Sequence, residues 1–188
     1  MRFTKIPETT FQELQLNAGI LVSTFNAETA VIGDILGATS GGVNFNATPS
    51  FVDFGEDIDN CPKNTKELKK LQDWEITMGG TFASVTAALA KRLVSVADLE
   101  TIKVVPRDQI LLTDYADMWW IGDYSDKNGD ATGGFVAIHM MNVLSTGGFQ
   151  IQTADKEKGK FAFTFTAHYS IDEQETVPFE IYVKSGTA

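Results

Sequence analysis

The second half of the chain alternates hydrophobic and polar residues with the period of a β-strand. Phe161, Phe163 and Phe165 fall on one side of an extended segment, whereas Thr164 and Thr166 fall mostly on the other. This alternation is typical of an antiparallel sheet that has one dry face. The pattern therefore predicts strands over residues 135–144, 148–153, 160–169 and 177–184.

The first half predicts shorter strands and one helix. Strands are expected over residues 18–25, 30–36, 43–48, 74–82, 102–105 and 118–122, with Pro49 at a bend or sheet edge and a possible bulge at Gly79–Gly80. Thr86 can cap a helix over residues 87–96, where Leu89 and Leu93 recur at helical spacing. The predicted fold is mainly β, an antiparallel β-sandwich or barrel with one flanking α-helix.

A long charged loop over residues 53–73 interrupts this pattern. Acidic residues come first and basic residues follow, in the order Asp53, Glu56, Asp57, Asp59, Lys63, Lys66, Lys69 and Lys70. Asn64 and Glu67 have the spacing of a capping box, which predicts a short helix over residues 65–71. A loop of this length is either a solvated excursion or an interaction loop.

Length, charge and cysteine content limit what kind of protein this is. The 188 residues fit a single domain, with residues 1–17 as an N-terminal arm and 185–188 as a C-terminal tail. The net charge of −10 disfavours binding to a nucleic-acid backbone, and it suits either solubility or a surface along which polyanions slide. The single Cys61 excludes an intrachain disulfide. With neither a signal peptide nor an apolar run long enough to span a membrane, we expect synthesis in the cytoplasm and no membrane partner.

Motifs for chemistry are weak throughout the chain. Residues 126–130 resemble part of a calcium loop, but Tyr124 and Phe135 stand where the first and last ligands belong. His139 and His168 form no metal motif with near neighbours, and no nucleophile elbow or phosphate loop occurs. We therefore predict no catalytic residue, metal site or cofactor. Trp119 and Trp120 are adjacent, so one should join the core and the other an outer face.

Several short sequence segments, taken in their order along the chain, resemble those of a known protein family. It lies in Asp53–Asn60 (DFGEDIDN), the following lysine-rich segment, Trp74–Thr77 (WEIT), Lys103–Arg107 (KVVPR), Asp117–Tyr124 (DMWWIGDY), Gly133–Phe135 (GGF), Leu144–Phe149 (LSTGGF) and Lys158–Phe161 (KGKF). Over roughly residues 15–184, the chain resembles the major tail proteins of long-tailed phages and prophages of Gram-positive bacteria.

This resemblance implies a virion structural protein, which assembles in the host cytoplasm into stacked hexameric rings. Neighbouring subunits continue one another's strands around an inner barrel, and genomic DNA passes through a negatively charged lumen without specific binding. The implied partners are further copies of this chain, the tape measure protein, and the tail terminator and tip proteins.

Two groups of candidate residues follow from this resemblance. The eight charged residues of the loop are candidates for contacts between rings, and the candidates that face the lumen or a neighbour are Gln150, Gln152, Thr164, Thr166 and His168. Two alternatives stay open: a β-sandwich that binds carbohydrate or protein through Trp119 or Trp120, and, with less support, a hydrolase.

Overall fold

The computed structural model describes residues 5–7, 10–124 and 134–185. The predicted turn at residues 126–130 and residues 186–188 of the predicted tail lie outside these ranges. Within the described residues, seven strands form one continuous antiparallel sheet: β1 (Gln15–Val22), β4 (Thr39–Asp53), β5 (Lys69–Phe82), β8 (Ala116–Tyr124), β9 (Phe135–Ser145), β10 (Phe161–Thr166) and β11 (Phe179–Lys184).

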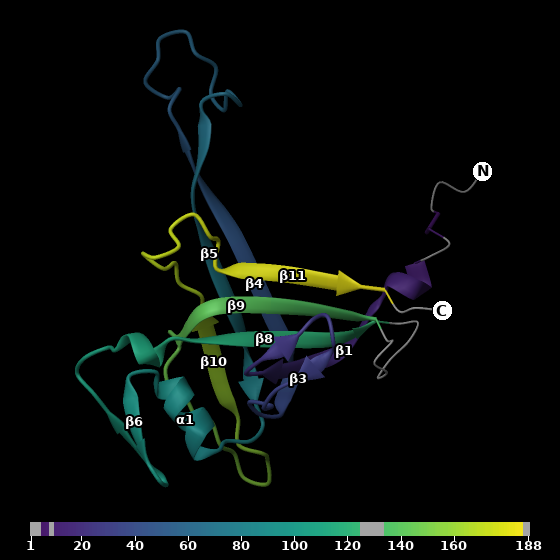
Figure 1. The fold of residues 1–188 in the computed structure, drawn as a ribbon, viewed down its shortest axis with the longest axis vertical. Helices are drawn as coiled ribbons and strands as arrows, with labels where there is room; N and C mark the ends of the chain where they lie inside the picture. The colour runs from purple at the N-terminus through teal and green to yellow at the C-terminus, as the bar shows by residue number, and fades with distance from the viewer. Residues whose placement is uncertain (1–4, 8–9, 125–133, 186–188) are drawn as a thin grey trace.

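Strand β9 folds this sheet into two layers. Along its first half β9 pairs with β8 on one side and β11 on the other, whereas its last two residues pair with β10. The first layer is therefore β1-β8-β9-β11 and the second is β10-β5-β4. Figure 1 shows the two layers crossing at a steep angle, with β4 and β5 extending far beyond the crossing. The predicted fold class is confirmed.

The main core lies between the two layers and the helix. Phe163 and Phe165 from β10 are buried against Ile76 and Met78 from β5 and Met140 from β9. Burial of each large apolar side chain contributes about 1.5–3 kcal/mol to folding, which is why the strict alternation along β10 fixes its register. The predicted dry face of this strand is therefore the face that holds the layers together.

Helix α1 (Ala87–Val94) closes one end of this core. The Thr86 hydroxyl accepts a hydrogen bond from the backbone N–H of Leu89 at 3.1 Å, which confirms the predicted N-cap. Leu89 and Leu93 face the core, as their spacing predicts. The helix ends two residues before the predicted boundary because the chain makes a γ-turn at Ser95, with φ of +70° and ψ of −71°, where the N–H of Val96 donates to the carbonyl of Val94 at 3.0 Å.

A second apolar cluster covers the other face of the first layer. The hairpin of β2 (Phe25–Asn26) and β3 (Val31–Ile32) places Phe25 edge-on against Trp119 and Phe135, with ring centroids 5.5 and 5.0 Å away. Trp119 is therefore buried although it points away from the main core. The indole N–H of Trp120 donates to the carbonyl of Ala18 at 3.0 Å, and its ring packs on the main core. The prediction of an outer-face tryptophan is wrong, because both faces of this layer are covered.

Several predicted boundaries are also wrong. Strand β1 begins at Gln15, so the N-terminal segment predicted to precede the first strand, residues 1–17, overlaps this strand. Residues 148–153 contribute one bridge, Gln152 to Lys160, instead of a strand, and Gly148 is left-handed with φ of +69°. The expected strand at 102–105 is β7 (Lys103–Pro106), which pairs with the unpredicted β6 (Ala97–Glu100). Short 3₁₀ turns lie at Thr10–Glu13 and Leu112–Asp114.

Candidate assembly surfaces

A two-stranded ribbon stands out from the body of the molecule (Figure 1). Strands β4 and β5 pair from Val43↔Gly80 out to Asp53↔Lys69, but β10 pairs with β5 only as far as Thr166↔Thr77. Residues 50–73, hereafter the arm, therefore lack a third strand. Two-stranded hairpins without a covering layer are marginally stable in water, so the arm requires further contacts.

The apolar face of the ribbon continues into the arm. Close to the body, Phe45 and Trp74 pack on Phe179 of β11, with ring centroids 5.8 and 5.5 Å apart. Farther out, Phe51 pairs with Leu71. A bulge between Ser50 and Phe51 in the register leaves Gln72 as an extra residue, and this keeps Leu71 on the same face as Trp74.

The described chain covers only about half of this outer stretch of the apolar face. Phe51 is 52 % exposed and Leu71 is 50 % exposed. Phe54 and Ile58, in the loop that closes the arm, are 63 % and 52 % exposed. Large apolar side chains that continue a core face into solvent are typical of a surface that a partner covers.

The closing loop of the arm is internally ordered. One Asp53 carboxylate oxygen accepts from the N–H of Gly55 at 2.9 Å, and the other accepts from the N–H of Asn64 at 2.8 Å. These two hydrogen bonds lower the pKa of Asp53 below its usual value. A Cβ on Gly55 would lie 2.9 Å from Leu68 and 3.0 Å from the thiol of Cys61, so the loop closes tightly here.

The predicted helix over residues 65–71 is wrong. Asn64 is left-handed with φ of +60°, whereas an N-cap residue is extended, and its N–H is already bonded to Asp53. Leu68 and Lys69 donate to the carbonyl of Thr65, which makes a single turn. Lys69, Lys70 and Leu71 belong to β5, since strand pairing outweighs a helix of two turns.

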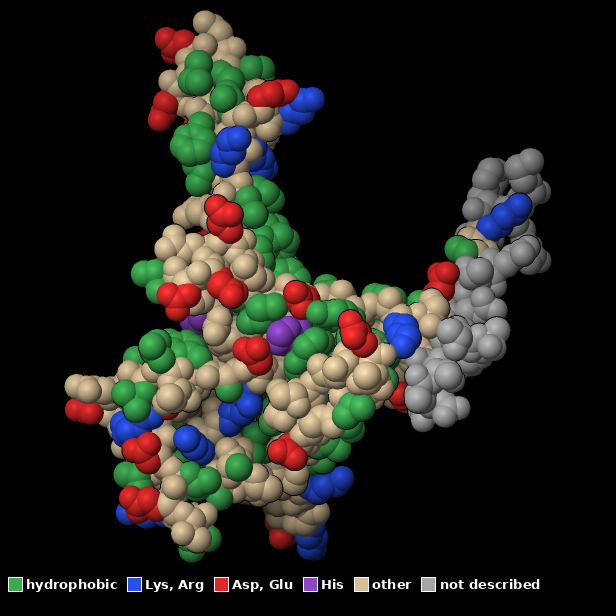
Figure 2. Space-filling model, viewed as in Figure 1, with side chains coloured by type: hydrophobic (Ala, Val, Ile, Leu, Met, Phe, Trp, Pro, Cys, Tyr) green, Lys and Arg blue, Asp and Glu red, His purple; other side chains and the backbone are tan. Residues whose placement is uncertain are grey.

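The charges predicted to contact another ring all lie on the arm. Glu56, Asp57 and Asp59 are exposed in the closing loop, and so are Lys63 and Lys66. Figure 2 shows acidic side chains in red and basic side chains in blue at the top of the molecule, where the arm lies. Lys69 and Lys70 are exposed on β5, and the Lys69 ammonium lies 4.9 Å from the centre of the Phe51 ring. Asp53 differs from the rest because it organises the loop.

The second layer has a polar outer face with few charges. Its side chains form rows across the strands, such as Asn46, Thr77 and Thr166. The hydroxyl of Thr166 lies 2.7 Å from that of Thr146. This polar face consists of Asn44, Asn46, Thr48, Glu75, Thr77, Thr81, Thr164 and Thr166. Glu75 is the one charged residue among these eight.

The structure places the predicted lumen candidates in different surroundings. Thr164 and Thr166 belong to the polar face. Gln150 and Gln152 lie at its margin, where with Thr81 they line a hollow of about 150 Å³. His168 lies apart from this face, because its ring packs edge-on against Tyr115 at 5.3 Å and its Nδ1 lies 3.1 Å from the carbonyl of Asn142.

Strand β4 presents a free edge. It is the last strand of the sheet, and no described strand pairs with its outer side. Gly41 and Gly42, at φ of +82° and +84°, form a bulge near its start, and Pro49 lies in the strand as expected for an edge position. The unpaired backbone groups of β4 can therefore pair with a strand of another chain.

A histidine lies between two carboxylates on the first layer. His139 Nε2 lies 3.1 Å from Asp117, His139 Nδ1 lies 3.5 Å from Glu180, and the ring stacks on Trp119 at 4.0 Å. The Tyr182 hydroxyl donates to Glu180, which raises the pKa of Tyr182. Both ring nitrogens face carboxylates, so His139 links β8, β9 and β11. The members of this cluster are far apart in the chain, so no local sequence pattern predicts it.

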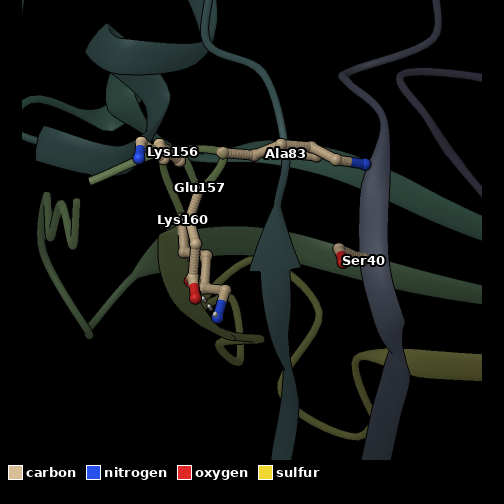
Figure 3. Close-up of a pocket in the computed structure, with 7 residues that line it drawn as sticks. Ser40, Ala83, Lys156, Glu157 and Lys160 are labelled. Carbon is tan, nitrogen blue, oxygen red and sulfur yellow. Dashed lines mark ion pairs between the residues drawn. The ribbon is translucent and has the colours of Figure 1, made fainter. Parts of the chain in front are cut away.

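Several hollows lie on the surface of the described part of the chain. Figure 3 shows one of about 310 Å³, lined by Ser40, Ala83 and residues 156–160, where Lys160 and Glu157 form an ion pair at 3.8 Å. No group of His, Cys, Asp or Glu among the described residues has the arrangement of a metal site. Within the same ranges, no helix has the length and apolar character of a membrane span.

No protein-family model matches the chain, and no curated protein matches it.

Proposed function

We propose that this chain is a structural protein that assembles with copies of itself into stacked rings, forming the tail tube of a phage-like particle through which DNA passes. The rings are hexameric by the resemblance to major tail proteins. In this role the chain needs surfaces for its neighbours instead of an active site.

The observation that carries this proposal is the arm. It extends the apolar face of the core beyond the body, with Phe51 and Leu71 half-exposed on a ribbon of only two strands. A monomeric protein gains nothing from such an element, because its exposed apolar area and its two-stranded pairing are both unfavourable in water. A neighbouring subunit that covers the arm removes both costs.

The free edge of β4 supports a second kind of contact. A strand edge with unpaired N–H and C=O groups pairs with a strand of the next subunit, and repetition around a ring leaves no free edge. The two contacts use different surfaces of the same chain. The arm contact joins unlike surfaces and extends a stack, whereas the edge contact closes a ring.

The polar face supports the assignment of a lumen. It lies on the same layer as the free edge, so a ring closed through β4 places this face on a continuous wall. Between Asn44 and Thr48, Glu75 and Thr81, and Ala162 and Thr166, the strands carry no Lys or Arg. Because these strand residues present no Lys or Arg to neutralise phosphates, they displace no counterions from DNA, and this favours passage without adhesion. Lys160, which lines the hollow at the margin of the face, forms an ion pair with Glu157 at 3.8 Å.

Sedimentation of the purified protein over a range of concentrations tests the proposal. We expect rings and longer assemblies above a threshold concentration, and striated tubes in negatively stained images of the same samples. A sedimentation coefficient that stays at the monomer value, with folded protein throughout the range, contradicts the proposal.

A further inference from the structure

The two layers of the sheet cross at a steep angle, so the inner face of each layer continues past the other layer. At the crossing, Phe45 and Trp74 of the second layer pack on Phe179 of the first, with ring centroids 5.8 and 5.5 Å away. Beyond the crossing, the second layer continues into the arm and the first continues along β11 (Figure 1). One stretch of layer-on-layer packing is therefore complete within the subunit, and each layer carries a further stretch that lacks its opposite layer.

Strand β11 carries the uncovered stretch of the first layer. Ile181 and Val183 follow Phe179 with period two, so they lie on the face that meets the second layer. Their partners across the strand pair are Ile138, which is buried in the main core, and the half-buried Val136. Ile181 is 55 % exposed and Val183 is 61 % exposed. We call these two residues the β11 strip.

The polar residues of β11 lie on its opposite face. The Tyr182 ring packs on Trp119 at 5.4 Å and its hydroxyl donates to Glu180, whereas the Lys184 ammonium lies 5.7 Å from the centre of the Phe135 ring. The side chains of the β11 strip carry neither a charge nor a hydrogen-bonding group. Covering them with apolar side chains therefore removes apolar surface from water and leaves no polar side chain of the strip unsatisfied.

The arm carries the uncovered stretch of the second layer. Phe51 and Leu71, here called the arm strip, continue the face of Phe45 and Trp74 and are 52 % and 50 % exposed. The Lys69 ammonium, 4.9 Å from the centre of the Phe51 ring, marks the outer end of this strip. The strands that supply the aromatic side of the internal interface thus supply a further apolar pair beyond it.

The two strips do not cover each other within one chain. In Figure 1 the arm and β11 leave the crossing in different directions, so the arm strip and the β11 strip diverge from the shared contact at Phe179. A second copy offers each strip the opposite layer that it lacks. The packing between copies then has the same components as the packing inside the subunit, a β4–β5 face on a β11–β9 face.

We propose that the arm strip of one copy packs on the β11 strip of a second copy. Continuity with the internal interface carries this inference, because each strip extends one of the two surfaces that meet at Phe179. The strips are different surfaces, so the contact repeats from copy to copy without closing on a pair. This inference rests on the proposed function, since it names the surface of the adjoining ring that receives the arm.

Two other exposed apolar surfaces lack this continuity. Val31 is 62 % exposed, but its hairpin covers the opposite face of the first layer, where Phe25 packs on Trp119. Ile171 is 82 % exposed beside a hollow of about 420 Å³, whose lining also includes Asp172 and other polar residues. These two positions therefore serve as controls.

Cysteine cross-linking tests the contact, because Cys61→Ser leaves a chain without thiols. In that background, one test variant combines Leu71→Cys with Val183→Cys and a second combines Phe51→Cys with Ile181→Cys. The assembled protein is treated with a short thiol-to-thiol cross-linker. We expect a ladder of dimers, trimers and longer multimers on a denaturing gel, since each copy contributes both strips. The matched controls combine Leu71→Cys with Val31→Cys or with Ile171→Cys.

Folding and assembly of the variants are measured separately. All the replaced residues except Cys61 are at least half-exposed, so the melting temperature of each variant should stay close to that of the Cys61→Ser chain. A variant that does not assemble alone is mixed with an equal amount of the Cys61→Ser chain, which carries it into the assembly. Cross-linked dimers between neighbouring variant copies are then the expected product.

The outcomes separate this inference from the proposed function. Tubes in which neither test variant cross-links, or in which a control cross-links as strongly, overturn the β11 strip as the receptor while the tube stands. Cross-linking specific to the test variants in particles that are not tubes supports the contact and contradicts the proposed tube. A Cys61→Ser chain that stays monomeric, alone and in every mixture, contradicts both.

Discussion

Replacement of Phe54 by serine separates assembly from folding. Phe54 is 63 % exposed in the subunit and stands in the loop that closes the arm. Its backbone N–H donates to the carbonyl of Leu68 at 3.1 Å, and this bond is independent of the side chain. The substitution therefore leaves the loop conformation in place and removes only the apolar side chain.

The expected cost to assembly follows from the area that a neighbour covers. If 63 % of a phenylalanine surface of roughly 200 Å² becomes buried, about 125 Å² leaves water. At about 25 cal/mol per Å² this contributes about 3 kcal/mol per subunit, which corresponds to a threshold concentration roughly 100-fold higher in the variant. The free energy of unfolding of the monomer should change by no more than about 0.5 kcal/mol, as at other exposed positions.

The assay is the threshold concentration for sedimentable assemblies, measured for wild type, Phe54→Ser and the control Ile102→Ser. Ile102 is 88 % exposed but lies on the β6–β7 hairpin, so its replacement should leave the threshold unchanged. Urea unfolding of dilute protein measures the stability of each monomer. An unchanged threshold for Phe54→Ser, or an equal increase for Ile102→Ser, refutes the reasoning that the arm tip is buried on assembly.

Three further predictions concern charge. Lys66, Lys69 and Lys70 replaced together by Glu should leave folded subunits that form no tubes, and unimpaired tubes of this variant count against the charged contact. Because two backbone N–H groups lower the pKa of Asp53, its ordering of the arm tip is complete above the usual pKa of an aspartate and is lost as pH falls through the lowered value. The N–H resonances of Gly55 and Asn64 should report this loss in acid, and Asp53→Asn should change them already at neutral pH; identical spectra of the two proteins argue against it. Thr164→Lys combined with Thr166→Lys should make assembled tubes retain DNA in a salt-dependent manner, whereas the control variant, Thr164→Ser combined with Thr166→Ser, should not retain DNA. If the Lys variant retains no DNA, the polar face does not line a lumen.

The alternation along β10 and the cap at Thr86 were readable in the sequence because each is local. The spacing of Phe161, Phe163 and Phe165 by two residues is enough to indicate that they share one face of a strand. The hydroxyl of Thr86 caps the helix by accepting a hydrogen bond from an N–H only three residues away. Both features depend on contacts within one element or its nearest neighbour, and the structure has them as predicted.

The wrong predictions concern segments whose conformation or burial depends on contacts with residues far away in the chain. The lysine-rich segment has a helical capping pattern, yet pairing of Leu71 with Phe51 across the arm makes it a strand. One of Trp119 and Trp120 was expected on an outer face; Trp119 does point away from the main core, but the β2–β3 hairpin covers it. A hairpin of two-residue strands leaves almost no periodic signal in the sequence. A surface hollow of about 420 Å³ is lined by both Leu112 and Ile171, which lie far apart in the chain, so only the fold brings them together.

Image reconstruction of the assembled particle by electron cryomicroscopy tests the central claim most directly. The account predicts stacked rings around an open lumen, with Thr164 and Thr166 on the inner wall, strand β4 paired with the next subunit and the arm reaching the adjoining ring. Particles without a lumen, or tubes whose polar face points outward with the arms unengaged, contradict it.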